Sequence, residues 1–166
     1  MATGVGADVA ESPAVRLRAR RATLGLTVAA AAGIDPAVWS AYETATRTLP
    51  DAEMSRLSAA IGFRPSTAVT VHRDQILTLC RDHRTRAPRI FGSIARGTDT
   101  SDSDIDLLVD ALPGTGLFTL IHLEWAIEAL CGTDVDLITD GGLPNAPAAI
   151  RASILADCRP LPLRGR

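Results

Sequence analysis

The sequence predicts an α+β protein in which an all-helical front module precedes a small mixed sheet flanked by helices. Apolar residues recur at helical spacing up to residue 63, whereas helical stretches alternate with short acidic-apolar runs after residue 71. The charge changes sign between the two halves. Residues 12–64 carry seven Arg and four acidic residues, and residues 73–166 carry ten Arg and thirteen acidic residues. We therefore infer two modules with different partners.

The pattern divides the chain into four segments: a flexible tail over residues 1–11, a helical module over 12–63, a linker over 64–70 and an α+β module over 71–166. The tail lacks the basic start and apolar stretch of a signal peptide, and no apolar run is long enough to span a membrane. The cysteines form no CxxC pair and the histidines are not at ligand spacing, which favours free thiols over zinc. We expect a cytoplasmic protein with no membrane partner.

Four short helices are expected in the front module. They cover Arg16–Thr23, Ala29–Ala32, a stretch from Pro36 to about Ala45, and a stretch that begins at Asp51. The third has a clear start, because Asp35 is a good N-cap and Pro36 falls at the first helical position. In the fourth, Met54, Leu57 and Ile61 share one face.

Three strands are expected between the helices of the α+β module. Apolar residues at helical spacing predict helices over Val71–His83, Leu117–Cys131 and Ala148–Ala156. Short apolar or alternating runs predict strands over Arg89–Phe91, Asp104–Asp110 and Asp134–Ile138. A Gly-rich turn and a short helical piece separate the first two strands.

Two aspartates lie side by side on the second of these strands. Side chains alternate between the faces of a strand, so Ile105, Leu107 and Val109 point into a core while Asp104 and Asp106 point the other way. Neither ionised carboxylate can be buried cheaply, and a divalent cation would remove the repulsion between them. Mg²⁺ prefers carboxylate, water and phosphate oxygens, so a nucleoside triphosphate would complete its shell.

The third strand offers another carboxylate. Asp136 precedes two apolar residues, as Asp106 does, and it joins the acidic pair if the two strands are neighbours. Three carboxylates can hold two metal ions, one that activates an attacking hydroxyl and one that holds the triphosphate. Asp104, Asp106 and Asp136 are therefore the candidate metal ligands and catalytic residues, with Asp136 also serving as the base.

A Gly-Ser turn precedes the acidic strand. Gly92 allows the backbone to approach phosphate closely, and Ser93 and the backbone N–H groups of a helix start can donate to phosphate oxygens. Arg96 lies one turn later and can pair with phosphate. Each of these features alone has a structural explanation, since an acidic pair on a strand is most often a solvated face. Their succession in one region favours a nucleotide site.

The segment GSIARGTDTSDSDIDLLV, residues 92–109, resembles the minimal nucleotidyltransferases, a group of the polymerase-β superfamily. Their pattern is Gly-Ser, a short spacer and Asp-x-Asp, which Gly92-Ser93 and Asp104-Ile105-Asp106 match. Val135-Asp136-Leu137 matches the third carboxylate of that group. The resemblance covers Arg73 to the C-terminus, and it implies a polymerase-β-like fold and Mg²⁺-dependent transfer of a nucleotide, usually AMP from ATP.

Many members of this group are antitoxins encoded beside a HEPN-family RNase toxin, and they attach AMP to a toxin tyrosine. The resemblance therefore implies a HEPN-type toxin as partner. Two alternatives stay open. The protein is a DNA-binding regulator that neutralises its partner by contact, with a weak or inactive nucleotidyltransferase fold, or it is an enzyme with a small-molecule acceptor, as in the aminoglycoside nucleotidyltransferases.

The front module resembles a Cro/C1-type (XRE) helix-turn-helix, in which the third helix reads the major groove of operator DNA. The resemblance is carried by Gly33-Ile34, by residues 38–43 and by Pro50. Candidate DNA contacts are Arg16, Arg18 and Arg20 on the first helix, Ser40 on the third, and Arg47 in the loop after it. The second helix is short, and apart from Ser40 the base-facing positions are apolar. A helical docking or dimer module is the alternative.

Overall fold

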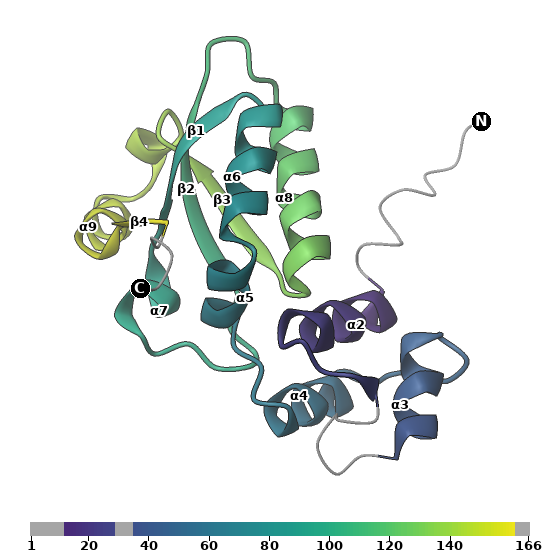
Figure 1. Ribbon diagram of the computed structural model, residues 1–166. Coiled ribbons are helices and arrows are strands. Elements are labelled where there is room, and N and C mark those ends of the chain that lie inside the picture. Colours follow the sequence, from purple (N-terminus) through teal and green to yellow (C-terminus); the bar gives the residue numbers. More distant parts are fainter. Residues whose placement is uncertain (1–11, 29–34, 162–166) are drawn as a thin grey trace.

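A four-stranded mixed sheet forms the centre of the computed structural model, which describes residues 12–28 and 35–161 (Figure 1). Its strands are β1 (Thr85–Ile90), β2 (Ile105–Ala111), β3 (Val135–Thr139) and β4 (Arg159–Pro160), in the order β3-β2-β1-β4. β2 and β3 run parallel, while β1 is antiparallel to both of its neighbours. The expected α+β architecture with a mixed sheet is therefore confirmed.

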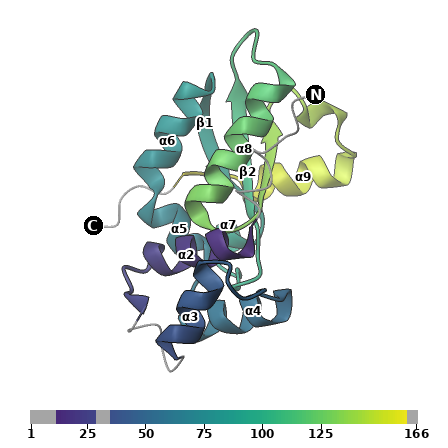
Figure 2. The ribbon, with the colours of Figure 1, turned by 90° about the vertical axis from the view of Figure 1, so that its right-hand side faces the viewer.

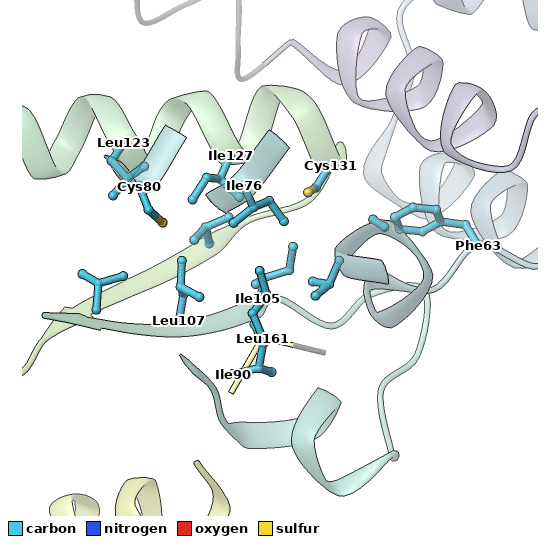
Figure 3. Packing of buried hydrophobic residues seen from close by; sticks show 14 residues of the cluster. Phe63, Ile76, Cys80, Ile90, Ile105, Leu107, Leu123, Ile127, Cys131 and Leu161 are labelled. Carbon is cyan, nitrogen blue, oxygen red and sulfur yellow. The ribbon is translucent and has the colours of Figure 1, made fainter. Parts of the chain in front are cut away.

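Two helices, α6 (Arg73–Asp82) and α8 (Leu117–Cys131), cover one face of the sheet. Figure 3 shows the core between them, where Ile105 and Leu107 of β2 meet Ile76 of α6 and Ile127 of α8. Ile105, Leu107 and Val109 are at most 1% exposed, as the alternation along the strand predicts.

The opposite face of the sheet is covered only in part. The helix α9 (Ala148–Asp157) and the short 3-10 helix η2 (Leu143–Asn145) lie over it. A small apolar cluster forms there from Phe91, Leu108, Leu143 and Ile154. Since Leu108 of β2 already belongs to this second cluster, the residues two and four positions before it, Asp106 and Asp104, lie on the same face.

The described part of the front module contains α2 (Pro13–Thr23), α3 (Pro36–Glu43) and α4 (Asp51–Ala60). They share a separate core made by Leu17, Trp39, Tyr42, Leu49, Met54 and Leu57. The Asp35 side chain accepts a hydrogen bond from the Ala37 backbone N–H at 2.8 Å, which confirms the predicted N-cap of α3. The predicted helix Ala29–Ala32 lies outside the described residues, as does most of the turn that a helix-turn-helix needs.

The stretch predicted as a linker, residues 64–70, is instead largely helical. It forms α5 (Pro65–Val71), in which Pro65, Ala68 and Val69 are buried. Ala68 and Val69 belong to the apolar core between the sheet and its covering helices. Pro65 occupies the first turn, where a missing N–H is harmless, and the buried Asp99 carboxylate accepts the Ser66 N–H at 3.0 Å. The predicted helix Val71–His83 is correspondingly divided, and α6 starts only at Arg73.

The strands begin at other residues than predicted. β1 begins at Thr85 rather than Arg89, because a bulge between Arg86 and Arg89 interrupts the pairing that a regular pattern would reveal. β2 and β3 each begin one residue later than predicted, which places Asp104 and Asp134 just before them. β4 was not predicted, and α8 has the predicted bounds.

The front module packs directly on the sheet module. Figures 1 and 2 both show α2 against the lower end of α8, where the chain turns at Gly132. Gly132 has φ +72°, and a Cβ there would lie 2.7 Å from the carbonyl oxygen of Arg16 on α2. Among the described residues, no helix is long and apolar enough to cross a membrane.

We predict that Gly132→Ala lowers the free energy of unfolding by about 2 kcal/mol or more, combining left-handed strain with overpacking against α2. Gly62→Ala is the matched control, because Gly62 has φ +71° but no neighbour within 4 Å of its added Cβ. That control should lose only about 1–2 kcal/mol from backbone strain. Urea denaturation measures both, and equal losses would show that the contact between α2 and Gly132 is not tight.

Candidate active site

Asp106 and Asp136 are direct partners in the parallel pairing of β2 with β3. Both lie on the sheet face that α6 and α8 do not cover. Asp104 precedes β2 by one residue and is exposed, and Asp136 is exposed as well, whereas Asp106 is half-buried. The neighbouring strands that the sequence analysis required for the third carboxylate are therefore present.

The turn at Gly92 fits closely around Asp106. Gly92 has φ +65°, and a Cβ on it would lie 1.9 Å from Oδ2 of Asp106, so no side chain can occupy this position. The next residue, Ser93, donates its backbone N–H to the Asp106 carboxylate. Its hydroxyl is buried and has no hydrogen-bond partner within the described residues. A buried hydroxyl in this state retains a hydrogen-bond donor that it can offer to a ligand.

The three carboxylates interact electrostatically. Burial, together with the negative charges of Asp104 and Asp136, raises the pKa of Asp106 to about 6, although Arg96 and the Ser93 N–H act in the opposite direction. The described part of the chain nevertheless holds no group of three or more His, Cys, Asp or Glu side chains arranged to bind a metal ion.

Arg96, at the end of the short helix α7 (Gly92–Arg96), forms an ion pair with Asp157 on α9. The Arg96 side chain is half exposed, and it also lowers the pKa of Asp106. The candidate phosphate-binding arginine thus has a carboxylate partner from the other side of the site. A triphosphate that binds Arg96 must compete with Asp157 for it.

A pocket of about 390 Å³ opens between α7, the two parallel strands and α9. Its lining includes Gly92, Arg96, Asp106 and Asp136 of the predicted site, together with Phe91, Ile138, Ile150, Ser153, Ile154 and Asp157. A larger hollow of about 520 Å³ lies between α6 and α8, away from these carboxylates. Converging charged groups in a concave site favour the smaller pocket as the functional one.

Sequence reasoning missed the α9 residues of this pocket, chiefly Ile150, Ser153 and Asp157. No motif identifies them, because they reach the site only through the folding of α9 over the sheet. It also missed two glutamates of α8. Glu128 accepts the Val135 N–H at 3.2 Å, and Glu124 accepts the Leu137 N–H, so both hold the outer edge of β3.

The expectation that Arg20 contacts DNA phosphates is wrong in this structure. Its side chain is only 5% exposed and faces the junction between the two modules. It donates to the carbonyl oxygens of Gly132 and Ser101 and to the Ser58 hydroxyl. All of these partners belong to the protein itself, so burial removes Arg20 from any DNA-facing surface.

The other candidate DNA contacts are distributed differently. Arg18, Ser40 and Arg47 are exposed on the front module. Arg16 is only 19% exposed and forms an ion pair with Asp134 at 2.5 Å, just before β3. Three of the five residues therefore remain on a surface that DNA could reach.

A Gly-Ser turn against an acidic strand, with a third aspartate on the parallel neighbour, is the arrangement that the sequence analysis expects of a nucleotide-transferring enzyme. Residues 74–160, just over half of the chain, match the family described as "Nucleotidyltransferase domain". The chain belongs to this nucleotidyltransferase family, and every predicted catalytic, metal-binding and nucleotide-binding residue lies within the matched range.

The chain is also similar to particular proteins of this kind. It is 42% identical over 59 residues to the protein adenylyltransferase MntA of Thermococcus cleftensis, covering 36% of this chain and 60% of that protein. It is 35% identical over 65 residues to a Methanocaldococcus jannaschii protein named as a candidate protein adenylyltransferase, covering 39% of this chain and 70% of that one. A solved structure of a candidate minimal nucleotidyltransferase aligns with TM-score 0.50 and 33% identity, covering 58% of this chain and 95% of that chain. These alignments support a minimal nucleotidyltransferase domain.

We predict that Asp106 titrates near pH 6 in the protein without added cations, and that Asp104→Asn lowers its pKa by removing a like charge. Because the folded state binds this proton more tightly than the unfolded chain does, ionisation of Asp106 reduces stability as the pH rises from about 3.8 to about 6. Asp106→Asn should therefore stabilise the protein at pH 7, by on the order of 1 kcal/mol.

Carboxyl-carbon NMR titration measures the pKa of Asp106, and urea unfolding at pH 7 measures the stability. Titration of Asp106 near 3.8, unchanged by Asp104→Asn, would contradict the electrostatic description of the site.

Proposed function

We propose that this protein transfers AMP from ATP to a hydroxyl group of a partner protein in a Mg²⁺-dependent reaction. The observation that carries the proposal is the pairing of Asp106 with Asp136 across β2 and β3, beside the Gly92-Ser93 turn. The similarity to proteins named as protein adenylyltransferases supports AMP as the transferred group.

The donor set of the site fits Mg²⁺. The negative charges of Asp104 and Asp136 raise the pKa of Asp106, and a cation would relieve this repulsion. The Ser93 hydroxyl is a buried donor that can bind a phosphate oxygen. Asp104, Asp106 and Asp136 would hold the ions, two as the family resemblance implies. When bound, Mg²⁺ would neutralise the triphosphate and stabilise the charge that develops during transfer.

The chain's own residues have distinct roles in this proposal. Ser93 and Arg96 hold the triphosphate, and Arg96 exchanges its partner Asp157 for phosphate oxygens as ATP binds. Asp136 accepts the proton of the acceptor hydroxyl. The hydroxyl oxygen bonds to the α-phosphorus, the bond from that phosphorus to the β-phosphate oxygen breaks, and pyrophosphate leaves.

The acceptor is proposed to be a toxin of the HEPN type, so that the protein acts as the antitoxin of a toxin–antitoxin pair. This part rests on the resemblance to minimal nucleotidyltransferases. The rim of the pocket is consistent with a protein acceptor, because Ile150 on α9 is 52% exposed beside it.

The transfer reaction predicts that the purified protein, with Mg²⁺ and ATP labelled in the α-phosphate, labels the product of its neighbouring gene. Asp106→Asn and Asp136→Asn should each reduce labelling at least about a hundredfold, since each removes a metal ligand or the base. Asp110→Asn is the matched control, because Asp110 lies on the same face of β2 but pairs with Arg89. It should keep labelling within about twofold.

The alternative, neutralisation by contact alone, gives a different result. No label on the partner, together with full neutralisation by an Asp104→Ala/Asp106→Ala double variant, would overturn the enzymatic proposal.

We also propose that the front module binds operator DNA for autoregulation. Arg18 and Arg47, which are exposed, are the candidate phosphate contacts, and the exposed Ser40 is the candidate base contact. Arg18→Ala and Arg47→Ala should each weaken a band shift on DNA upstream of the gene and reduce its salt slope by about one. An unchanged affinity and salt slope in both variants would exclude this surface from DNA binding.

A further inference from the structure

We propose that α2 is a positioning element of the active site, in which Arg20 fixes the two loops that lead to the catalytic carboxylates. This inference rests on the proposed nucleotidyl transfer and assigns a part of it to the front module. Arg20 lies outside the matched family range of residues 74–160, so the family pattern does not account for it.

The contacts of Arg20 connect three parts of the chain. Its Nε donates to the Gly132 carbonyl oxygen at 2.7 Å, and its Nη1 donates to the Ser101 carbonyl oxygen at 3.2 Å and to the Ser58 hydroxyl at 2.7 Å. The guanidinium group also lies over the ring of Phe63, 4.7 Å from its centroid. The planar fork of an arginine can hold several acceptors in a fixed geometry, which a lysine cannot reproduce.

Both carbonyl partners lie close before a catalytic aspartate. Ser101 is in the loop that ends at Asp104, and Gly132 begins the loop that leads to Asp136. The two loops are joined to each other as well. The Thr133 hydroxyl donates to the Ser103 carbonyl oxygen at 3.0 Å, and the Ile105 N–H donates to the Asp134 carbonyl oxygen at 2.9 Å.

A second arginine of α2 strengthens the same junction. Arg16 forms its ion pair with Asp134, two residues before Asp136. A single helix of the front module therefore contacts the approach to β2 through Arg20 and the approach to β3 through both arginines. Through these contacts, the relative placement of Asp104 and Asp136 depends on α2. This placement matters for the rate, because misplacement of a catalytic group by about 1 Å can reduce a rate up to a hundredfold.

Burial of a charged side chain at this point needs a reason beyond packing. Desolvation lowers the pKa of Arg20 to about 10, so burial disfavours its charge, although the group remains ionised at neutral pH. An apolar residue would fill the same space without that penalty. An apolar residue could not, however, donate hydrogen bonds to the carbonyl oxygens of both Ser101 and Gly132.

The test compares Arg20→Gln with Arg21→Gln in the full chain. Arg21 is the matched control, because its side chain is also largely buried. Its hydrogen bonds among the described residues go to Glu43 and to the Leu26 carbonyl oxygen, both within the front module. Thermal melting ranks the loss of stability in each variant. The labelling reaction, run well below both melting temperatures, then gives kcat and KM for ATP.

We expect Arg20→Gln to lower kcat about tenfold or more while KM for ATP changes less than about threefold, and Arg20→Lys to recover only part of the loss. Arg21→Gln should keep kcat within about twofold even where it lowers Tm as much. Activity losses that follow Tm equally in both variants, or an unchanged kcat in Arg20→Gln, would overturn the proposal.

A second measurement does not depend on transfer activity. Amide hydrogen exchange of the ligand-free protein should accelerate over residues 101–104 and 132–136 in Arg20→Gln but not in Arg21→Gln. If Arg20→Gln does not fold, Arg16→Gln replaces it, with faster exchange expected over residues 132–136. Unchanged exchange in these loops would overturn the positioning role, while absent transfer in the wild-type protein would overturn only the proposed function.

Discussion

The parallel pairing of β2 with β3 is the constraint on which the site depends. It brings Asp106 and Asp136 into direct register, and the alternation of side chains along each strand turns both away from the apolar core. A slip of one residue in either strand would exchange its charged and apolar faces, so the buried Ile105, Leu107 and Val109 fix the orientation of the carboxylates. The packing of the core and the placement of the charges are thus one and the same requirement.

The sequence predicts this part of the structure well because the pattern is local. The alternation in β2 and β3, the bounds of α8 and the Gly92-Ser93 turn all follow from residue spacing within short segments. Gly92 adds a feature that appears only in the tertiary structure, since its missing side chain makes room for Asp106. β2 and β3 each begin one residue later than predicted, because Asp104 and Asp134 lie just before the paired part of their strands.

The features that the sequence does not predict depend on distant partners. The buried face of α5 is made by contacts with the α+β module, which the local sequence does not show, so the short Pro-containing stretch 64–70 is predicted as a linker. Arg96 meets Asp157 across 61 positions of sequence, and Arg20 reaches Gly132 across 112. An arginine on a predicted helix surface is most often solvated, and only the tertiary structure shows that Arg20 is buried.

Electrostatic strain at the site is consistent with a function that needs a cation. The raised pKa of Asp106 means that the fold holds this carboxylate where its charge is unfavourable. Functional sites commonly retain such groups at a cost in stability.

The most direct test of a metal-dependent nucleotide site is a calorimetric titration of the protein with a non-hydrolysable ATP analogue, with and without Mg²⁺. Our account predicts tight binding only with Mg²⁺ and the loss of this dependence in Asp106→Asn. Equal affinity without Mg²⁺, unaffected by that substitution, would contradict it.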